Sequence, residues 1–198
     1  MKRIEDLFER AKKLKEKGLT TGEIADELNV SRETALWLLT KAREDIAPPS
    51  DIYIEWKKIA TPFRMRLIAN IMVDMINETI NQEPDIVVGV ATSGIPLATL
   101  VADELNAELS IYYPKKLKWE ENVKHISGVF SENYAKVDGK RCIIIDDIIS
   151  TGRTIEEVSN YISKKDGKVL CTAVIVDKKG VDAINSIPVV SLIKILRI

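Results

Sequence analysis

Two adjacent carboxylates and a run of small hydroxylated residues follow an apolar stretch in the second half of the chain. The sequence there is Arg141-Cys-Ile-Ile-Ile-Asp-Asp-Ile-Ile-Ser-Thr-Gly-Arg-Thr-Ile155. We expect a strand, a short loop and a helix start, which together aim backbone N–H groups and the positive end of the helix dipole at one point, where phosphate binds. Gly152 lets the backbone close around an anion. Asp146 and Asp147 end the strand, where carboxylates suit diol hydroxyls or a magnesium ion.

The stretch from Asp146 to Thr154 resembles the signature by which phosphoribosyltransferases bind 5-phosphoribosyl 1-diphosphate (PRPP): Asp-Asp, two apolar residues, then Thr/Ser-x-Gly-x-Thr. The resemblance implies that the two carboxylates hold the ribose hydroxyls and that the loop cradles the 5-phosphate. It implies the following PRPP-binding residues: Asp146, Asp147, Ser150, Thr151, Gly152, Arg153 and Thr154. Mg²⁺ would enter with PRPP, with Asp146 and Asp147 as its candidate protein ligands, and no organic cofactor is expected.

A second strand, loop and helix start lies at Asp85-Ile-Val-Val-Gly-Val-Ala-Thr-Ser-Gly-Ile-Pro-Leu-Ala98, with Pro96 in the first helical turn. It is similar to the diphosphate-binding loop of orotate phosphoribosyltransferases, including their Gly-Ile-Pro-Leu-Ala helix start. The resemblance implies that backbone N–H groups of four residues line the diphosphate: Ala91, Thr92, Ser93 and Gly94. Ser93 stands where the orotate enzymes carry a lysine, so a cation that would stabilise departing diphosphate is missing.

Between the two loops, residues 111–128 are polar and rich in lysine, which predicts a long hairpin or a flexible hood. Orotate phosphoribosyltransferases close a mobile lysine-rich loop on diphosphate, so the resemblance makes Lys115 and Lys116 diphosphate-binding candidates. In an active enzyme the catalytic candidates would be Lys116, Lys118 and His125. The alternative for each residue is a solvated charged loop, which is the usual place for an exposed lysine.

Apolar runs alternate with helical stretches beyond residue 50, as expected for a parallel sheet covered by helices. Because residues 143–145 are all isoleucine, with no polar alternation, we expect strands buried on both faces. The fold class is therefore α/β, and by resemblance a type I phosphoribosyltransferase-like sheet flanked by helices. The Pro48-Pro49 pair predicts a boundary between an all-α domain at 1–47 and this α/β domain at 51–198. Residues 51–56 resemble a short strand near the start of the orotate enzymes.

The all-α segment has two helical patterns joined at Asn29-Val-Ser31. Asn29 suits the left-handed conformation that ends a helix, and Ser31 suits the N-cap of the next one. The segment resembles a helix-turn-helix module, whose second helix enters the DNA major groove. The resemblance implies the following DNA-binding candidates: Ser31, Arg32, Glu33, Thr34, Trp37, Lys41 and Arg43. The alternative is a helical hairpin used for dimerisation, because residues 1–45 carry balanced charge.

Composition narrows the class of protein. The chain has 198 residues, 45% of them hydrophobic and 30% charged, which supports a folded core and excludes wholesale disorder. We expect a cytoplasmic protein, because no apolar run approaches the length of a membrane span and no signal-peptide pattern is visible. The net charge of −1 gives no overall attraction to nucleic acid. Cys142 and Cys171 lie in apolar runs, which predicts buried thiols.

Three functions are compatible with these features. The whole architecture resembles the archaeal orotate phosphoribosyltransferase-like regulators. The resemblance implies a homodimer that binds a double-stranded DNA operator and responds to PRPP or a related metabolite. We expect no membrane partner. The architecture also parallels the bacterial purine repressor. The second function is an active orotate or purine phosphoribosyltransferase, which Ser93 and the helical N-terminal module disfavour. The third is a structural adaptor, which would leave both phosphate loops unexplained.

Overall fold

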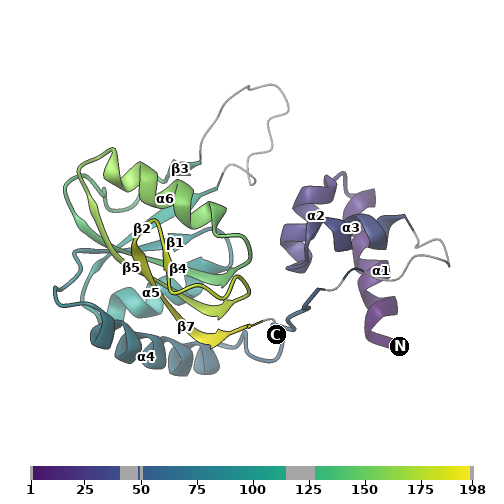
Figure 1. Cartoon of the computed structure of the whole chain (residues 1–198), viewed down its shortest axis with the longest axis horizontal. Coiled ribbons are helices and arrows are strands. Elements are labelled where there is room, and N and C mark those ends of the chain that lie inside the picture. Colours follow the sequence, from purple (N-terminus) through teal and green to yellow (C-terminus); the bar gives the residue numbers. More distant parts are fainter. Residues whose placement is uncertain (1, 41–48, 50, 115–127, 197–198) are drawn as a thin grey trace. The chain divides into compact units, whose positions relative to one another are not determined.

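The computed structural model describes residues 2–40, 49, 51–114 and 128–196 and divides into two compact units, 1–56 and 57–198 (Figure 1). The first unit contains α1 (Lys2–Glu16), α2 (Thr21–Leu28) and α3 (Arg32–Leu39). A capping box between Thr20 and Glu23 starts α2, and hydrogen bonding to Thr20 lowers the pKa of the Glu23 carboxyl. A small apolar core joins the three helices: Ala11, Ile24, Ala25, Leu28, Val30, Ala35 and Leu38.

The corner between α2 and α3 has the predicted local chemistry. Asn29 is left-handed with φ 53°, and the side chain of Ser31 accepts a hydrogen bond from the Thr34 N–H. Asp51 adds a second cap, because its carboxylate accepts bonds from Ser31 N at 2.5 Å and from Thr34 Oγ1 at 3.0 Å. Residues 51–56 form no strand, unlike the segment of the orotate enzymes that they resemble, and the structural division follows Trp56.

The second unit is a mixed sheet covered by helices, so the predicted α/β class is confirmed (Figure 1). Its strands lie in the order β3-β2-β1-β4-β5-β7-β6, with both edge pairs, β2/β3 and β6/β7, antiparallel and the pairs between them parallel. The strands are β1 (Ile86–Val90), β2 (Glu108–Tyr113), β3 (Val129–Phe130), β4 (Arg141–Ile149), β5 (Lys168–Asp177), β6 (Ala183–Ile184) and β7 (Ile187–Lys194). The helices are α4 (Pro62–Thr79), α5 (Gly94–Glu104) and α6 (Arg153–Ser163).

The strand order places a topological switch point beside β1. The chain leaves β1 for β2 on one side and later enters β4 on the other side of β1. Ligands of open α/β sheets bind in the crevice outside the carboxyl ends of the strands at such a point. The loops that follow β1 and β4 are the two loops singled out in the sequence.

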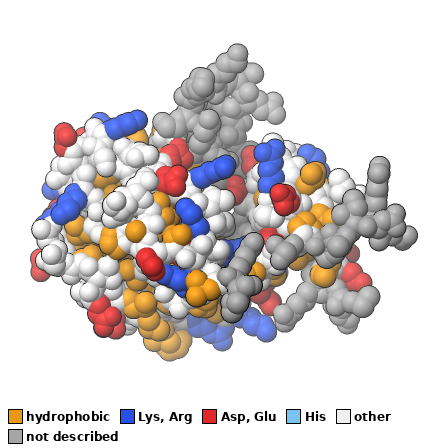
Figure 2. Space-filling model, viewed as in Figure 1, with side chains coloured by type: hydrophobic (Ala, Val, Ile, Leu, Met, Phe, Trp, Pro, Cys, Tyr) orange, Lys and Arg blue, Asp and Glu red, His pale blue; other side chains and the backbone are white. Residues whose placement is uncertain are grey.

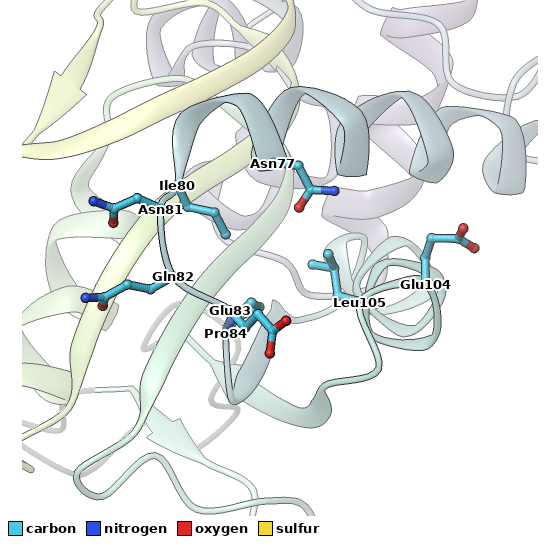
Figure 3. A pocket seen from close by; sticks show the side chains of 8 residues that line it. All are labelled: Asn77, Ile80, Asn81, Gln82, Glu83, Pro84, Glu104 and Leu105. Atoms are coloured by element: carbon cyan, nitrogen blue, oxygen red, sulfur yellow. The ribbon is translucent and has the colours of Figure 1, made fainter.

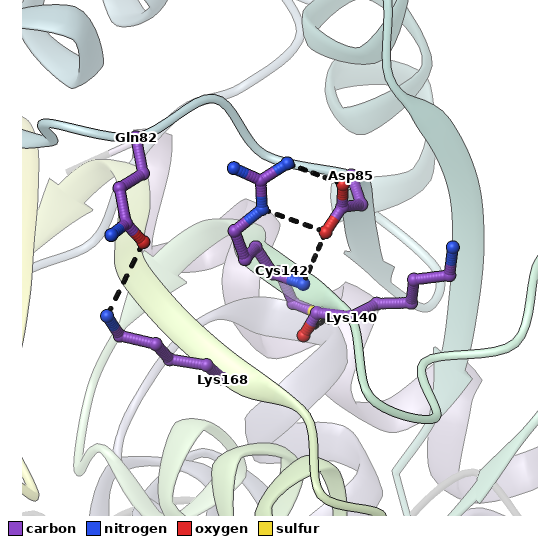
Figure 4. Close-up of polar contacts among 6 residues, drawn as sticks. Gln82, Asp85, Lys140, Cys142 and Lys168 are labelled. Atoms are coloured by element: carbon purple, nitrogen blue, oxygen red, sulfur yellow. Dashed lines mark hydrogen bonds and ion pairs between the residues drawn. The ribbon is translucent and has the colours of Figure 1, made fainter.

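An ion pair joins the amino ends of the parallel strands β1 and β4, away from the two loops (Figure 4). Asp85 accepts three hydrogen bonds from Arg141, from the backbone N at 2.8 Å, from Nε at 3.0 Å and from an η nitrogen at 2.7 Å. The Arg141 guanidinium holds the pKa of the Asp85 carboxyl well below its usual range. The nearby Lys168 ammonium bonds Gln82 at 3.5 Å and adds a contact at the start of β5.

Candidate functional site

Asp146 and Asp147 occupy the last part of β4 with different surroundings. Asp146 is partly exposed, whereas Asp147 is 8% exposed. The Asp147 N–H donates to Asp146 Oδ1 at 2.9 Å. Burial raises the pKa of the Asp147 carboxyl, whereas the nearby Ser93 side chain acts to lower it. A ligand that donates hydroxyl hydrogens or brings a cation would therefore stabilise the ionised pair.

The loop after β4 turns sharply into α6. Gly152 has φ +83°, a conformation that a residue with a side chain rarely adopts, and it is the N-cap of α6. The Thr151 hydroxyl accepts a weak bond from Arg153 N at 3.4 Å. Ser150 and Thr151 are exposed, and Thr154 is half-buried. The first N–H groups of a helix lack intrahelical acceptors, so this turn presents N–H and hydroxyl donors to an anion.

The loop after β1 lies directly against the Asp146 backbone. A β-carbon on Gly94 would lie 2.7 Å from Ile145 O and 3.1 Å from Asp146 Cα, so only glycine fits without movement. The Ala91 N–H donates to Tyr112 O at 2.8 Å, and the peptide bond between Ala91 and Thr92 is cis. Thr92 and Ser93 are exposed. The structure thus brings the two sequence motifs together at one edge of the sheet.

The end of β5 contributes a cation that sequence reasoning missed. The buried Asp177 carboxylate accepts bonds from the N–H groups of Lys179, Gly180 and Val181, each at 2.9 Å, and so fixes the turn. Lys179 Nζ lies 3.0 Å from the point that a β-carbon of Gly152 would occupy and 4.0 Å from Glu156 Oε1. An acidic residue followed by lysines and glycine at a strand end was the available signal.

Comparisons with known proteins show which family the chain belongs to. The sequence model described as phosphoribosyl transferase domain matches residues 55–195. Transcriptional regulator GfcR of Archaeoglobus fulgidus is 57% identical over 198 residues, with 100% of both chains covered. The protein of the same name from Methanocella arvoryzae is 47% identical over 206 residues, again with 100% of both covered. The chain belongs to the GfcR family.

A solved structure shows which fold this GfcR-family member shares. Adenine phosphoribosyltransferase from Rhodothermus marinus has a TM-score of 0.56 and 20% sequence identity, covering 76% of this chain and 91% of that chain. The likeness at this identity concerns the fold, which is that of the type I phosphoribosyltransferases. Because the GfcR relatives align over their full length, the three-helix unit belongs to the family's common chain as well.

The predicted DNA-binding residues of this GfcR-family member fall into two groups. Ser31, Arg32 and Glu33 are exposed at the start of α3. Thr34 is occupied by the Ser31 and Asp51 caps, and Trp37 is half-buried with its ring centroid 5.0 Å from that of Phe8. Leu36, which was not among the predicted residues, is 53% exposed on α3. The predicted Lys41 and Arg43 fall outside the described residues.

The four predicted hood residues, Lys115, Lys116, Lys118 and His125, also lie outside the described residues. Gly128 is the first described residue after them. Its backbone N–H donates to Glu157 Oε1 at 2.5 Å, which links Gly128 to α6. Tyr112, Phe130 and Tyr161 pack as an aromatic cluster beside this contact, with centroid distances of 4.9 to 6.4 Å.

The carboxylate oxygens of Asp146 and Asp147 are donors of the kind that Mg²⁺ prefers. Within 2–40, 49, 51–114 and 128–196, no cluster of three or more His, Cys, Asp or Glu side chains could hold a metal by itself. Asp146 and Asp147 supply carboxylate oxygens only, and Mg²⁺ is commonly held by one or two carboxylates plus substrate phosphates and water.

The described helices include none long and apolar enough to cross a membrane.

A separate groove of 460 Å³ lies on the amino side of β1, between the ends of α4 and α5 (Figure 3). Its lining is Asn77, Ile80, Asn81, Gln82, Glu83, Pro84, Glu104 and Leu105. None of the predicted site residues lines it. Open α/β sheets bind their ligands at the carboxyl edge, so this groove is not the candidate site.

Proposed function

We propose that the chain is a homodimeric transcription regulator that binds PRPP, or a related phosphoribosyl metabolite, at the carboxyl edge of its sheet and binds operator DNA through α2 and α3. One observation carries the ligand assignment: Gly94 lies so close to Asp146 that an added β-carbon would be 3.1 Å from Asp146 Cα, so the loops after β1 and β4 flank one carboxylate pair. The full-length match to proteins named transcriptional regulators supports the regulator assignment.

Each part of PRPP has a matching group. The 5-phosphate fits the turn at 150–154, where helix N–H groups and hydroxyls converge, and the Lys179 ammonium next to Gly152 adds a positive charge. The ribose diol fits the carboxylates of Asp146 and Asp147. The diphosphate fits the loop 91–94, with Mg²⁺ offsetting the repulsion between its charge and the carboxylates.

The DNA assignment depends on the start of α3. Recognition helices of helix-turn-helix proteins contact base edges with their N-terminal residues, and here Ser31, Arg32 and Glu33 are exposed at that end. Arg32 supplies a guanidinium that can reach guanine or a phosphate. A single module of this size reads little sequence, so two copies on a two-fold operator are required for specific binding.

The test of the ligand assignment is calorimetric titration of the purified chain with PRPP and magnesium. The paired substitution Asp146→Asn with Asp147→Asn removes both negative charges and replaces one acceptor oxygen of each side chain with an NH2 donor. It is expected to abolish the heat of binding without unfolding the protein. The paired substitution Asp103→Asn with Glu104→Gln is the matched control, because it removes two adjacent exposed carboxylates at the end of α5, and it is expected to bind as the wild type does.

The same samples separate the regulator from a transferase. Binding without base-dependent release of diphosphate supports the regulator, whereas release with orotate or a purine base at enzyme-like rates identifies a phosphoribosyltransferase. For DNA, selection of binding sites from a random library followed by Arg32→Ala tests α3. Wild-type affinity and specificity in that variant would contradict the assignment of α3 as the recognition helix.

A further inference from the structure

Helix α4 has two apolar faces. One face is buried on the sheet and includes Ala69, Met72, Val73 and Ile76. The other face carries Phe63, Leu67 and Ile71 at four-residue spacing, with exposed fractions of 72%, 48% and 53%. Residues four apart lie above one another on a helix, so these three side chains form one continuous ridge, here named the α4 ridge. A large apolar patch with a polar rim is typical of an interaction site.

The charges along α4 are separated by sign. Arg64 and Arg66 lie in its first half, whereas Asp74 and Glu78 lie in its second half, and all four are exposed. Lys57 and Lys58 extend the basic end beyond the helix. In Figure 2, hydrophobic side chains gather along the lower edge of the larger unit, where Figure 1 places α4, with Lys and Arg side chains toward one end.

We propose that the α4 ridge docks a second copy of this chain, with the two α4 helices antiparallel about a two-fold axis. This arrangement places the basic end of one helix against the acidic end of the other. Because of the two-fold axis, the contact occurs twice in the interface. With the axis between Leu67 and Ile71, Leu67 contacts the partner's Ile71, and Arg64 faces the partner's Asp74. Antiparallel helices pack well when ridges of residues four apart interdigitate.

The size of the ridge predicts how the dimer behaves. Its three apolar side chains offer roughly 300 Å² per copy, while a standard interface needs about 800 Å² per partner. The charged flanks must therefore supply much of the interface, so the dimer weakens as salt screens them. The ridge names the partner surface for the homodimer of the proposed function and rests on that part of it, but it is independent of the metabolite assignment.

Sedimentation equilibrium of the full-length chain tests the proposal. Leu67→Glu is expected to weaken the dimer by more than about tenfold, because it buries a charge at the centre of the interface. Tyr134→Glu is the matched control, since Tyr134 is a comparably exposed apolar side chain (42%) near the β2 edge of the sheet, and it is expected to leave the dimer unchanged.

Charge reversal gives the decisive experiment. Arg64→Glu with Arg66→Glu makes both ends of α4 acidic, and Asp74→Lys with Glu78→Lys makes both ends basic, so each variant alone is expected to be monomeric. An equimolar mixture is expected to form a heterodimer, which also demonstrates that both variants are folded. Two separate results overturn the proposal. A wild-type dimer that persists in Leu67→Glu and in both charge variants rejects this surface alone, whereas a monomeric wild type rejects the homodimer of the proposed function as well.

Discussion

Gly94→Ala tests whether the two phosphate loops act as one site. The added β-carbon would lie 2.7 Å from Ile145 O and 3.3 Å from Asp146 Oδ1, while ordinary contacts begin near 3.4 Å. The start of α5 and the end of β4 must therefore separate by about 0.7 Å. Overpacking of this kind destabilises by about 1 to 3 kcal/mol. At about 4 °C for each kcal/mol in a domain of this size, the melting temperature falls by roughly 4 to 12 °C.

Gly167→Ala is the matched control for Gly94→Ala. A β-carbon on Gly167 would lie 2.7 Å from Val137 O and 2.7 Å from Ile162 Cγ2, but this glycine precedes β5, at the amino edge of the sheet. We expect a similar loss of melting temperature in both variants and a loss of PRPP affinity only in Gly94→Ala. The assays are thermal unfolding and calorimetry on the same samples. Wild-type PRPP affinity in a destabilised Gly94→Ala, or an equal loss in both variants, would refute the reasoning.

Three further outcomes are expected. Thr20→Ala removes the capping box of α2 and should destabilise the three-helix unit by about 1 kcal/mol, measured by chemical unfolding. Asp85→Asn should lower the melting temperature most at neutral pH, because the pKa of Asp85 is depressed in the folded protein. The contribution of the ionised Asp85 to stability is fully present above its unfolded pKa of about 3.9 and is lost as the pH falls through the folded pKa. A difference between the Asp85→Asn protein and the wild type that grows on acidification would contradict this sign. Lys179→Met should weaken PRPP binding about tenfold with little change in melting temperature, while Glu156→Gln, which removes the competing carboxylate at 4.0 Å, should strengthen it; unchanged titration curves for both variants would reject a role for Lys179.

Signals that act over a few residues were readable in the sequence. The left-handed Asn29, the Ser31 N-cap and the buried isoleucine run that ends at Asp146 depend on backbone preferences and on hydrophobic pattern within one element. The α/β class followed from the alternation of such elements. The strand, loop and helix start around β4 could be predicted from the sequence because they are contiguous in the chain.

Contacts between distant segments required the tertiary structure. The sequence contained no sign that Asp51 would cap α3, because its partners are 17 and 20 positions away. The seat of Gly94 on Asp146 and the approach of Lys179 to Gly152 depend on which strands are neighbours, and strand order is decided by packing of the whole sheet. The exposed ridge of α4 was likewise hidden, because an apolar residue in a helix pattern does not reveal which face the sheet covers. The sequence by itself determined the α/β class, the corner at Asn29 and Ser31, and the residue types that each loop carries. The folded sheet decided which loops meet, since that depends on long-range packing and not on local preference.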